Sequence, residues 1–308
     1  MRAIVFAYSD LGCVGLQALL DLGVDVAAVF THADSPSEAI WFASVARLAA
    51  ERTLPVFTDE RLDTPEWKTR LRGWAPDFLF SFYYRRLLPV AVLETARRGA
   101  LNLHGSLLPK YRGRCPTNWV LIHDERETGV TLHYMVARAD AGDIVAQRRV
   151  PIDDDDTALT LYRKQCQATG DLLREVVPQL RDGSAPRRPN DIAHGSYFGG
   201  RTPADGVIDW SADARTIFNL VRAVAHPYPG AFTHWQGLPL FVWSARPSPP
   251  TPSDAAPGSV VAIDTDALVV QTGGGTLRLL TVQAADEAEM PGGAWARAHG
   301  VTKGMRFQ

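Results

Sequence analysis

The sequence predicts an α/β protein, in which a doubly wound, mostly parallel, Rossmann-like sheet is followed by a small antiparallel, OB-like barrel. The apolar runs Ala3–Ala7 and Phe78–Phe82 have the composition of parallel strands buried on both faces. Such runs alternate with helical segments in the first half of the chain, as in doubly wound folds. Beyond Ala231 the strand-like runs become short and closely spaced, which is typical of a small barrel.

Hydrophobic spacing and helix or turn signals place each element of the first part. Strands are expected at Ala3–Ala7, Val24–Phe30, Leu54–Phe57, Phe78–Phe82, Ala100–Leu103, Val130–Met135 and Gln147–Ile152. Helices are expected at Leu16–Leu22, Ser44–Arg52, Trp67–Trp74, Leu87–Ala96, Asn118–His123 and Thr157–Leu173. The segment Ser9–Gly15, between the first strand and the first helix, is expected to be a loop.

The second part begins after a linker. Arg181–Pro189 has the Gly, Ser, Pro and Arg composition of a linker. The expected division is a sheet domain at 1–189, a linker at 190–203 and the barrel at 204–308. The barrel region contains a helix at Ala214–Val224 and strands at Ala231–Trp235, Leu240–Ala245, Gly258–Ile263, Leu268–Gln271 and Thr276–Val282.

Composition excludes several classes of protein. The formal net charge of the 308 residues is −2, which gives no general attraction to nucleic acid or to anionic membranes. Cys13, Cys115 and Cys166 are far apart and suit neither a disulfide framework nor a zinc site. The N-terminal apolar run is too short for a signal peptide, and no stretch approaches the roughly 20 apolar residues of a membrane span. We therefore expect a cytoplasmic protein with small-molecule partners.

The stretch Gly99–Gly113, GALNLHGSLLPKYRG, carries the strongest functional signal. Asn102 and His104 stand two residues apart on a predicted strand, so their side chains share a face at the end where ligands gather in such sheets. An amide can hold a carbonyl oxygen while an imidazole moves a proton, which suits acyl-type chemistry. An isolated Asn-x-His is more often a turn beside an ordinary histidine, so the longer context decides. Pro109, Lys110 and Arg112 are expected to mark an exposed loop.

A second polar strand end follows Val130–Met135. Asp140 stands there, and Gly142 suits a tight turn behind it. The acidic run Asp153–Asp156 is expected to be a solvated loop that caps the next helix, because four adjacent aspartates cannot converge on one ion. We therefore expect no metal.

Four stretches spread over most of the chain carry a family resemblance: the opening strand with Gly12 and Gly15, Phe80–Leu88, Asn102–Gly113 and Thr131–Ile144. They resemble the formyltransferases that use 10-formyltetrahydrofolate. The fuller text, including FSFYYR, LHGSLLPKYRGR and ADAGDIVAQ, is most similar to the formyltransferase half of the bifunctional polymyxin-resistance enzyme, which formylates UDP-4-amino-4-deoxy-L-arabinose (UDP-L-Ara4N). A nicotinamide site is disfavoured, because Gly12–Gly15 lacks the first glycine of G-x-G-x-x-G.

The resemblance implies a catalytic trio of Asn102, His104 and Asp140. Asn102 would hold the developing oxyanion, and His104 would carry the proton. Asp140 would fix the tautomer of His104 and favour its imidazolium form.

The resemblance also implies binding positions for two substrates. For the folate they are Arg86, Leu87, Leu88, Arg114, Val136, Ala137, Arg138 and Ala139, and for the amino-sugar nucleotide they are Ser106, Lys110, Arg112 and Arg201. A surface ion pair is the alternative for Arg114, and simple solvation is the alternative for Lys110.

The choice of acceptor stays open among a UDP-amino sugar for lipid A modification, another nucleotide-linked amino sugar and methionyl-tRNA. A tRNA enzyme needs a basic path for phosphates. Residues 203–308 instead hold seven Lys and Arg against nine Asp and Glu, and Ala33–Ile40 holds no Lys or Arg. This distribution favours an amino-sugar nucleotide.

A non-catalytic folate-binding module is the remaining alternative. The intact trio argues against it, because binding alone requires no proton carrier. The oligomeric state is open, a homo-oligomer included. The NAD-dependent domain of the bifunctional relative has no counterpart up to Gln308, so either a separate protein supplies the amino sugar or the acceptor differs.

Overall fold

The computed structural model describes residues 1–36, 38–58, 60–248 and 254–308, which fall into two compact units. Unit 1 comprises 1–116, 127–151 and 162–199, and unit 2 comprises 117–126, 152–161 and 200–308. Residues 190–199, expected in a linker, therefore belong to unit 1. The two short segments 117–126 and 152–161, expected in the sheet domain, belong to unit 2.

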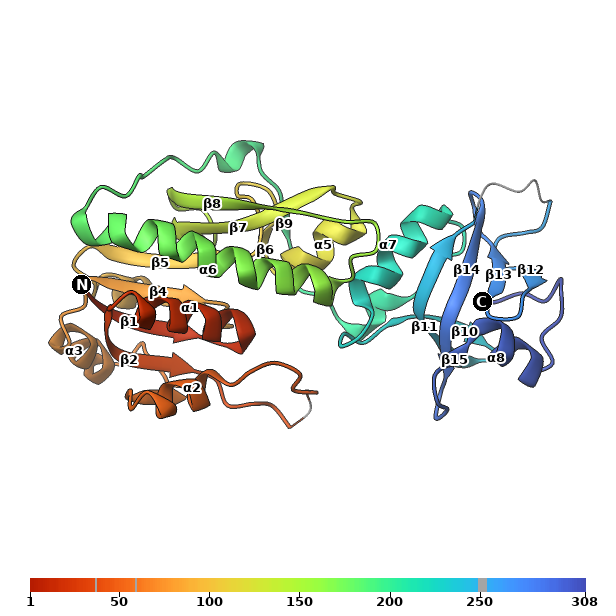
Figure 1. Ribbon diagram of the computed structural model, residues 1–308, viewed down its shortest axis with the longest axis horizontal. Coiled ribbons are helices and arrows are strands. Elements are labelled where there is room, and N and C mark those ends of the chain that lie inside the picture. The colour runs from red at the N-terminus through yellow and green to blue at the C-terminus, as the bar shows by residue number, and fades with distance from the viewer. Residues whose placement is uncertain (37, 59, 249–253) are drawn as a thin grey trace. The chain divides into compact units, whose positions relative to one another are not determined.

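Unit 1 is built on a seven-stranded sheet with the order β3-β2-β1-β4-β5-β7-β8 (Figure 1). The strands are β1 (Arg2–Ala7), β2 (Asp25–Thr31), β3 (Val56–Thr58), β4 (Phe78–Phe82), β5 (Gly99–His104), β7 (Glu127–Tyr134) and β8 (Ile144–Pro151). The first five pair in parallel, whereas β7 and β8 are antiparallel. The prediction of a mostly parallel, doubly wound sheet is thus confirmed.

The helices that connect these strands are α1 (Ser9–Asp21), α2 (Val45–Glu51), α3 (Pro65–Gly73), α4 (Val90–Leu93), α5 (Pro116–Ile122) and α6 (Ala158–Asp182). The expected loop at Ser9–Gly15 is wrong, because α1 begins directly after β1. The two glycines of that segment lie inside the helix instead of a turn. The expected helix Leu87–Ala96 is shortened to α4, since Pro89 stands immediately before it.

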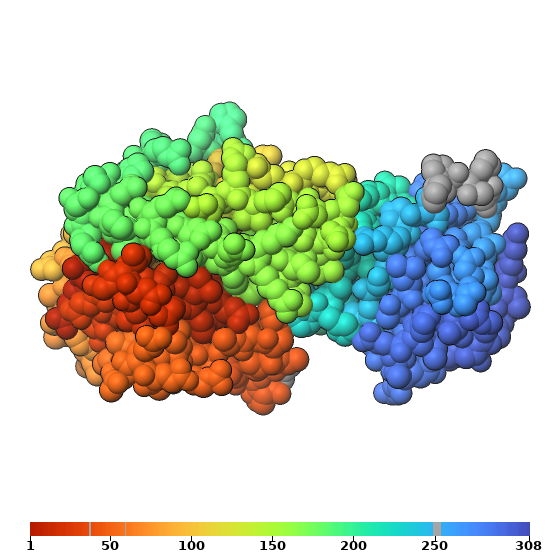
Figure 2. All heavy atoms as spheres, viewed as in Figure 1, coloured from red at the N-terminus to blue at the C-terminus, as the bar shows by residue number. Residues whose placement is uncertain are grey.

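The sheet is covered on both faces. On one face, Ile4, Phe30 and Leu79 form a cluster with Leu71 of α3 and Val92 of α4. On the other face lie α1 and α6, which run side by side (Figures 1 and 2). The close approach of α1 to the sheet requires glycine, because a Cβ on Gly15 would lie 2.5 Å from the ring of Phe82. Gly15 is therefore a close-packing glycine.

A short two-stranded parallel sheet stands apart from the main one. It pairs β6 (Arg112–Gly113) with β9 (Tyr197–Phe198), and the 3-10 helix η1 (Ile192–His194) precedes β9. The chain from Arg187 to Phe198 therefore runs along the loops that follow β5 and β7 in place of a free linker.

Unit 2 contains the predicted antiparallel sheet, with the order β10-β11-β14-β13-β12 and with β15 added beside β14. Its elements are η2 (Pro203–Gly206), α7 (Ala214–Val224), β10 (Ala231–Trp235), β11 (Leu238–Pro247), β12 (Val260–Ile263), β13 (Leu268–Gln271), β14 (Thr276–Ala284), β15 (Met290–Pro291) and α8 (Gly292–Ala298). The segment 304–308 joins the two edge strands. It exchanges backbone hydrogen bonds with His234 of β10 through Gln308 and with Val260 of β12 through Gly304 and Met305.

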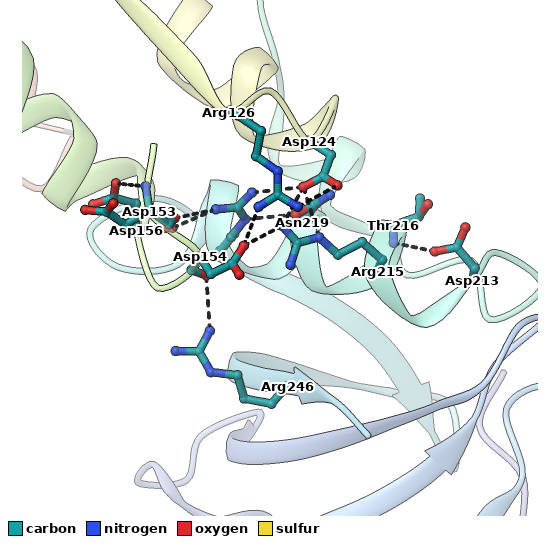
Figure 3. Close-up of polar contacts among 11 residues, drawn as sticks. Asp124, Arg126, Asp153, Asp154, Asp156, Asp213, Arg215, Thr216, Asn219 and Arg246 are labelled. Carbon is teal, nitrogen blue, oxygen red and sulfur yellow. Dashed lines mark hydrogen bonds and ion pairs between the residues drawn. The ribbon is translucent and has the colours of Figure 1, made fainter. Parts of the chain in front are cut away.

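An ionic network connects three chain segments within unit 2 (Figure 3). Arg215 of α7 donates to the carboxylate of Asp124 at 2.6 Å and to that of Asp154 at 3.0 Å. Arg222, which is 4% exposed, donates to the carbonyl oxygen of Asp153 and to the side chain of Asn219. The acidic run is thus part of an arginine network, and Thr157 accepts from the backbone of Thr160 at the start of α6.

Candidate active site

Two adjacent strands of unit 1 bring the polar side chains together. Asn102 and His104 stand on β5, and the antiparallel register places Asn102 opposite His133 of β7. The loop that follows β7 then carries Asp140 back to the same edge. The trio expected from the sequence is thereby assembled from residues that are distant along the chain.

His104 is buried, with both ring nitrogens facing protein atoms. Its Nε2 lies 2.7 Å from the carbonyl oxygen of Tyr111, and its Nδ1 lies 3.6 Å from Oδ1 of Asp140. A carbonyl oxygen only accepts, so Nε2 carries the proton in this arrangement, and Nδ1 of the neutral ring presents its lone pair. The proton-accepting atom of His104 is therefore Nδ1.

Burial is the main influence on the pKa of His104, and it lowers that pKa. The carboxylate of Asp140 and the carbonyl of Tyr111 raise the pKa, while His133 lowers it, and the net shift is downward. Asp140 thus favours the imidazolium form, as expected, but desolvation of the buried ring outweighs the carboxylate. The net effect favours the neutral ring of His104.

The carboxylate of Asp140 contacts the backbone of Gly113 and two histidine rings. Its Oδ2 accepts from the backbone N–H of Gly113 at 2.9 Å, and its Oδ1 lies 3.5 Å from Nε2 of His133. Burial alone would raise the pKa of Asp140, but the N–H of Gly113 and the two imidazoles in their protonated form hold the pKa well below its usual value. The side chain is thus a carboxylate that faces two imidazole rings.

His133 was not among the residues predicted from the sequence. It is 1% exposed, and its Nδ1 lies 2.9 Å from the carbonyl oxygen of Tyr134, so Nδ1 donates. In the neutral ring Nε2 can then accept from Nδ2 of Asn102, at 3.2 Å. One N–H of the Asn102 amide is used in this way, and the second remains for a ligand. The signal that could have found His133 is its place on a strand that ends beside Asp140.

The loop after β5 differs from expectation in its burial. Lys110 is exposed as predicted, but Arg112 is 5% exposed, so the prediction of an exposed loop is wrong for Arg112. The reason is that β6 pairs with β9 and that the ring of Tyr197 lies 5.8 Å from the guanidinium of Arg112. Ser106 is buried and donates to the carbonyl oxygen of Lys110, which fixes the turn.

Most of the residues expected to hold the folate are exposed. Leu87 is 82% exposed, and the residues 136–138 are exposed as well. Leu88 and Met135, which border these two segments, pack against the same hydrophobic cluster of unit 1. Arg114 is exposed, and its backbone N–H donates to the carbonyl oxygen of Phe198.

Arg201 lies in unit 2, where its guanidinium donates to the carbonyl oxygen of Asp205 and covers the ring of Trp119. Among the residues that the structure describes, no group of three acidic, histidine or cysteine side chains could hold a metal ion. Within the same residues, no helix is both long and apolar enough to cross a membrane.

Comparison with protein families gives two matches. Residues 10–177 match the formyl transferase family, and residues 201–300 match the formyl transferase C-terminal domain. The first match contains the whole constellation of Asn102, His104, His133 and Asp140.

Solved structures share the fold. A sugar 3N-formyl transferase, WlaRD, described in the presence of dTDP and 5-N-formyl-THF, is 17% identical with a TM-score of 0.70, over 94% of this chain and 99% of that one. An N-formyltransferase from Helicobacter canadensis, in complex with folinic acid and dTDP-3-aminofucose, is 18% identical with a TM-score of 0.67, over 91% and 98%. HypX from Aquifex aeolicus, in complex with tetrahydrofolic acid, is 20% identical with a TM-score of 0.64, over 97% of this chain and 47% of that one.

Proposed function

The chain belongs to the formyl transferase family, and we propose that it transfers a formyl group from 10-formyltetrahydrofolate to the 4-amino group of a UDP-linked amino sugar, UDP-L-Ara4N. The observation that carries the reaction type is the joint placement of Asn102, His104 and Asp140 at one sheet edge. The structural neighbours that were described with folates and dTDP-sugars support the two substrate classes. The particular sugar rests on the sequence resemblance.

The folate would supply the formyl group on a nitrogen of low basicity. The residues fit such a donor, because Arg86, Leu87 and the residues 136–138 are exposed. Leu88 and Met135, which border these two segments, pack against one hydrophobic cluster. Exposed backbone amides and carbonyls can bind the edge of a pterin ring, and Arg114 offers a guanidinium to a carboxylate. These residues are our proposed donor site.

The trio has the groups that the transfer needs. As the amine nitrogen bonds to the formyl carbon, negative charge develops on the formyl oxygen, and the second N–H of Asn102 can donate to it. The amine must lose a proton, and Nδ1 of His104 is the acceptor that the tautomer leaves available. The imidazolium formed faces the Asp140 carboxylate, which stabilises it. When the bond from carbon to the folate nitrogen breaks, the same proton can return to that nitrogen.

The acceptor site is proposed around Ser106, Lys110 and Arg112. The Nε and Nη1 atoms of Arg112 are buried and have no acceptor in the part of the chain that the structure describes. A guanidinium in this state is suited to an oxygen anion such as a diphosphate, which would reach it if Tyr197 moves aside. Arg201 is a further proposed contact. The net negative charge of residues 203–308 disfavours tRNA as the acceptor.

The test is turnover with the purified chain. We expect tetrahydrofolate release when 10-formyltetrahydrofolate and UDP-L-Ara4N are both present, with one formylated sugar formed for each folate released. Parallel reactions contain a dTDP-linked amino sugar or initiator methionyl-tRNA in place of UDP-L-Ara4N.

The turnover reactions distinguish the proposed acceptor from the alternatives. Tetrahydrofolate release with the dTDP-linked amino sugar alone would show that the acceptor is a different nucleotide sugar. Release with the tRNA alone would show that the acceptor is not a nucleotide sugar. Folate binding by calorimetry without release in any reaction would identify a binding module. His104→Gln is the matched control, because it should bind the folate without releasing product.

A further inference from the structure

One segment that contains none of the trio contacts both the loop after β5 and the loop after β7. This segment, Arg187–Phe198, is called the strap here. Arg187 forms an ion pair with Asp143 at 2.7 Å, and Arg188 pairs with Ile144 through two backbone hydrogen bonds. At its other end, the strap pairs with β6 through Tyr197 and Phe198. The strap thus connects the loop after β7 with the loop after β5.

Two residues in these loops hold a strained backbone conformation. Tyr111 has a φ of 57° and Asp140 has a φ of 50°, a region that side-chain-bearing residues rarely adopt. Both residues contact the ring of His104. The carbonyl oxygen of Tyr111 accepts from Nε2 of His104, and the carboxylate of Asp140 faces Nδ1. Such conformations persist only where the surroundings hold them in place.

The strap supplies one hydrogen bond to each strained residue. Oγ of Ser196 accepts from the backbone N–H of Tyr111 at 2.8 Å. Nδ2 of Asn190 donates to the backbone carbonyl of Asp140 at 3.0 Å. The first bond holds the N–H of Tyr111, whose own carbonyl accepts from Nε2 of His104. The second holds the backbone carbonyl of Asp140, whose carboxylate faces Nδ1 of His104.

We propose that Ser196 and Asn190 are positioning residues for the His104–Asp140 pair, each acting through the strained backbone of one residue. The kinetic part of this proposal rests on the proposed formyl transfer. Loss of the Ser196 acceptor releases the N–H of Tyr111, so this bond no longer holds the φ of Tyr111 or the direction of the carbonyl that accepts from Nε2 of His104. Loss of the Asn190 donor similarly frees the Asp140 backbone and shifts its carboxylate.

The kinetic test uses Ser196→Ala and Asn190→Asp. The first removes the acceptor, and the second keeps the shape but replaces the donating nitrogen with an oxygen. We expect kcat to fall about tenfold in each, with both KM values within twofold of the wild type, because neither residue is proposed to touch a substrate. Ser196→Thr, which keeps the hydroxyl, should restore most of the rate. Ser184→Ala is the matched control, since within the described residues Ser184 forms its side-chain hydrogen bond with Asp182, at an exposed position of the same connection.

A second background separates positioning from a general structural role. In His104→Gln, Ser196→Ala should cause no further loss of the residual rate, because the residue that it positions is gone. An equal tenfold loss in both backgrounds would overturn the proposal for Ser196. Asn190→Asp is tested in the same way in Asp140→Asn.

A readout without substrate keeps this proposal separate from the proposed function. In ¹⁵N-histidine-labelled protein, NMR identifies the protonated ring nitrogen of His104, and the His104→Gln spectrum assigns its signals. We expect a single Nε2–H tautomer in the wild type and a mixture, with a shifted His104 titration, in Ser196→Ala. An unchanged His104 spectrum in Ser196→Ala would overturn the positioning role even if the chain formylates a different acceptor or none.

Discussion

His104 donates from Nε2 to the carbonyl oxygen of Tyr111 at 2.7 Å, so the ring is fixed by the loop that follows its own strand. This bond leaves Nδ1 as the only ring atom that can take up a proton, and Nδ1 faces the Asp140 carboxylate. The direction of the ring therefore decides where proton transfer can occur.

Replacement of His104 should abolish most of the transfer without unfolding the chain. We expect His104→Gln to lower kcat by roughly 10²- to 10⁴-fold, the usual contribution of a positioned proton carrier. Glutamine keeps an N–H for Tyr111 but has no titratable nitrogen. The measurement is the rate of tetrahydrofolate release, with far-UV circular dichroism and thermal unfolding as the check on folding. A rate close to that of the wild type would exclude His104 as the proton carrier.

The amide of Asn102 and the ring of His133 should act as one unit. We expect Asn102→Ala to cost about 10²- to 10³-fold in kcat, as for removal of one oxyanion donor. His133→Phe removes the acceptor that orients this amide, so it should also lower kcat. In the double variant the loss should be smaller than the product of the single losses, because both changes remove the same interaction. Multiplicative losses would show that His133 acts independently of Asn102.

The buried, neutral state of His104 should make stability depend on pH. The unfolded chain takes up a proton on this residue near pH 6.5, whereas the folded chain does so only at a lower pH. The unfolded state then binds more protons, so the free energy of unfolding should fall as the pH drops from about 6.5 toward the folded pKa. The slope from one proton is at most about 1.4 kcal/mol for each pH unit.

Urea unfolding of the wild type and of His104→Gln at several pH values between 5 and 8 measures this effect. The other histidines contribute equally to both proteins, so the difference between the two curves reports His104. Parallel curves would contradict a lowered pKa for His104 in the folded state.

The contact between α1 and β4 should not tolerate a side chain at Gly15. A Cβ there would lie 2.5 Å from the ring of Phe82, which is itself fully buried. We expect Gly15→Ala to destabilise the fold by about 1–3 kcal/mol, the usual cost of overpacking. Gly73→Ala is the matched control, because nothing lies within 4 Å of a Cβ at Gly73 in α3. Equal urea midpoints for the two variants would contradict the close packing.

The sequence alone determined the helices and strands whose hydrophobic periodicity was clear. The strand Phe78–Phe82, the helix Ala214–Val224 and the strand Ala231–Trp235 lie where hydrophobic spacing placed them. The start of α1 was missed, because Gly12 and Gly15 carry turn signals that packing against the sheet overrides. Asn102, His104 and Asp140 stand at predicted strand ends, and the family resemblance named them as a trio.

Only the tertiary structure decided how these side chains are connected. Antiparallel pairing of β5 with β7 places His133 opposite Asn102, and no local pattern encodes that register. The pairing of β6 with β9 buries Arg112 and brings Ser196 to the Tyr111 peptide, although 85 residues separate Ser196 from Tyr111. Burial then outweighed the effect of Asp140 on the pKa of His104, because desolvation depends on everything that surrounds the ring and not on its neighbours in sequence.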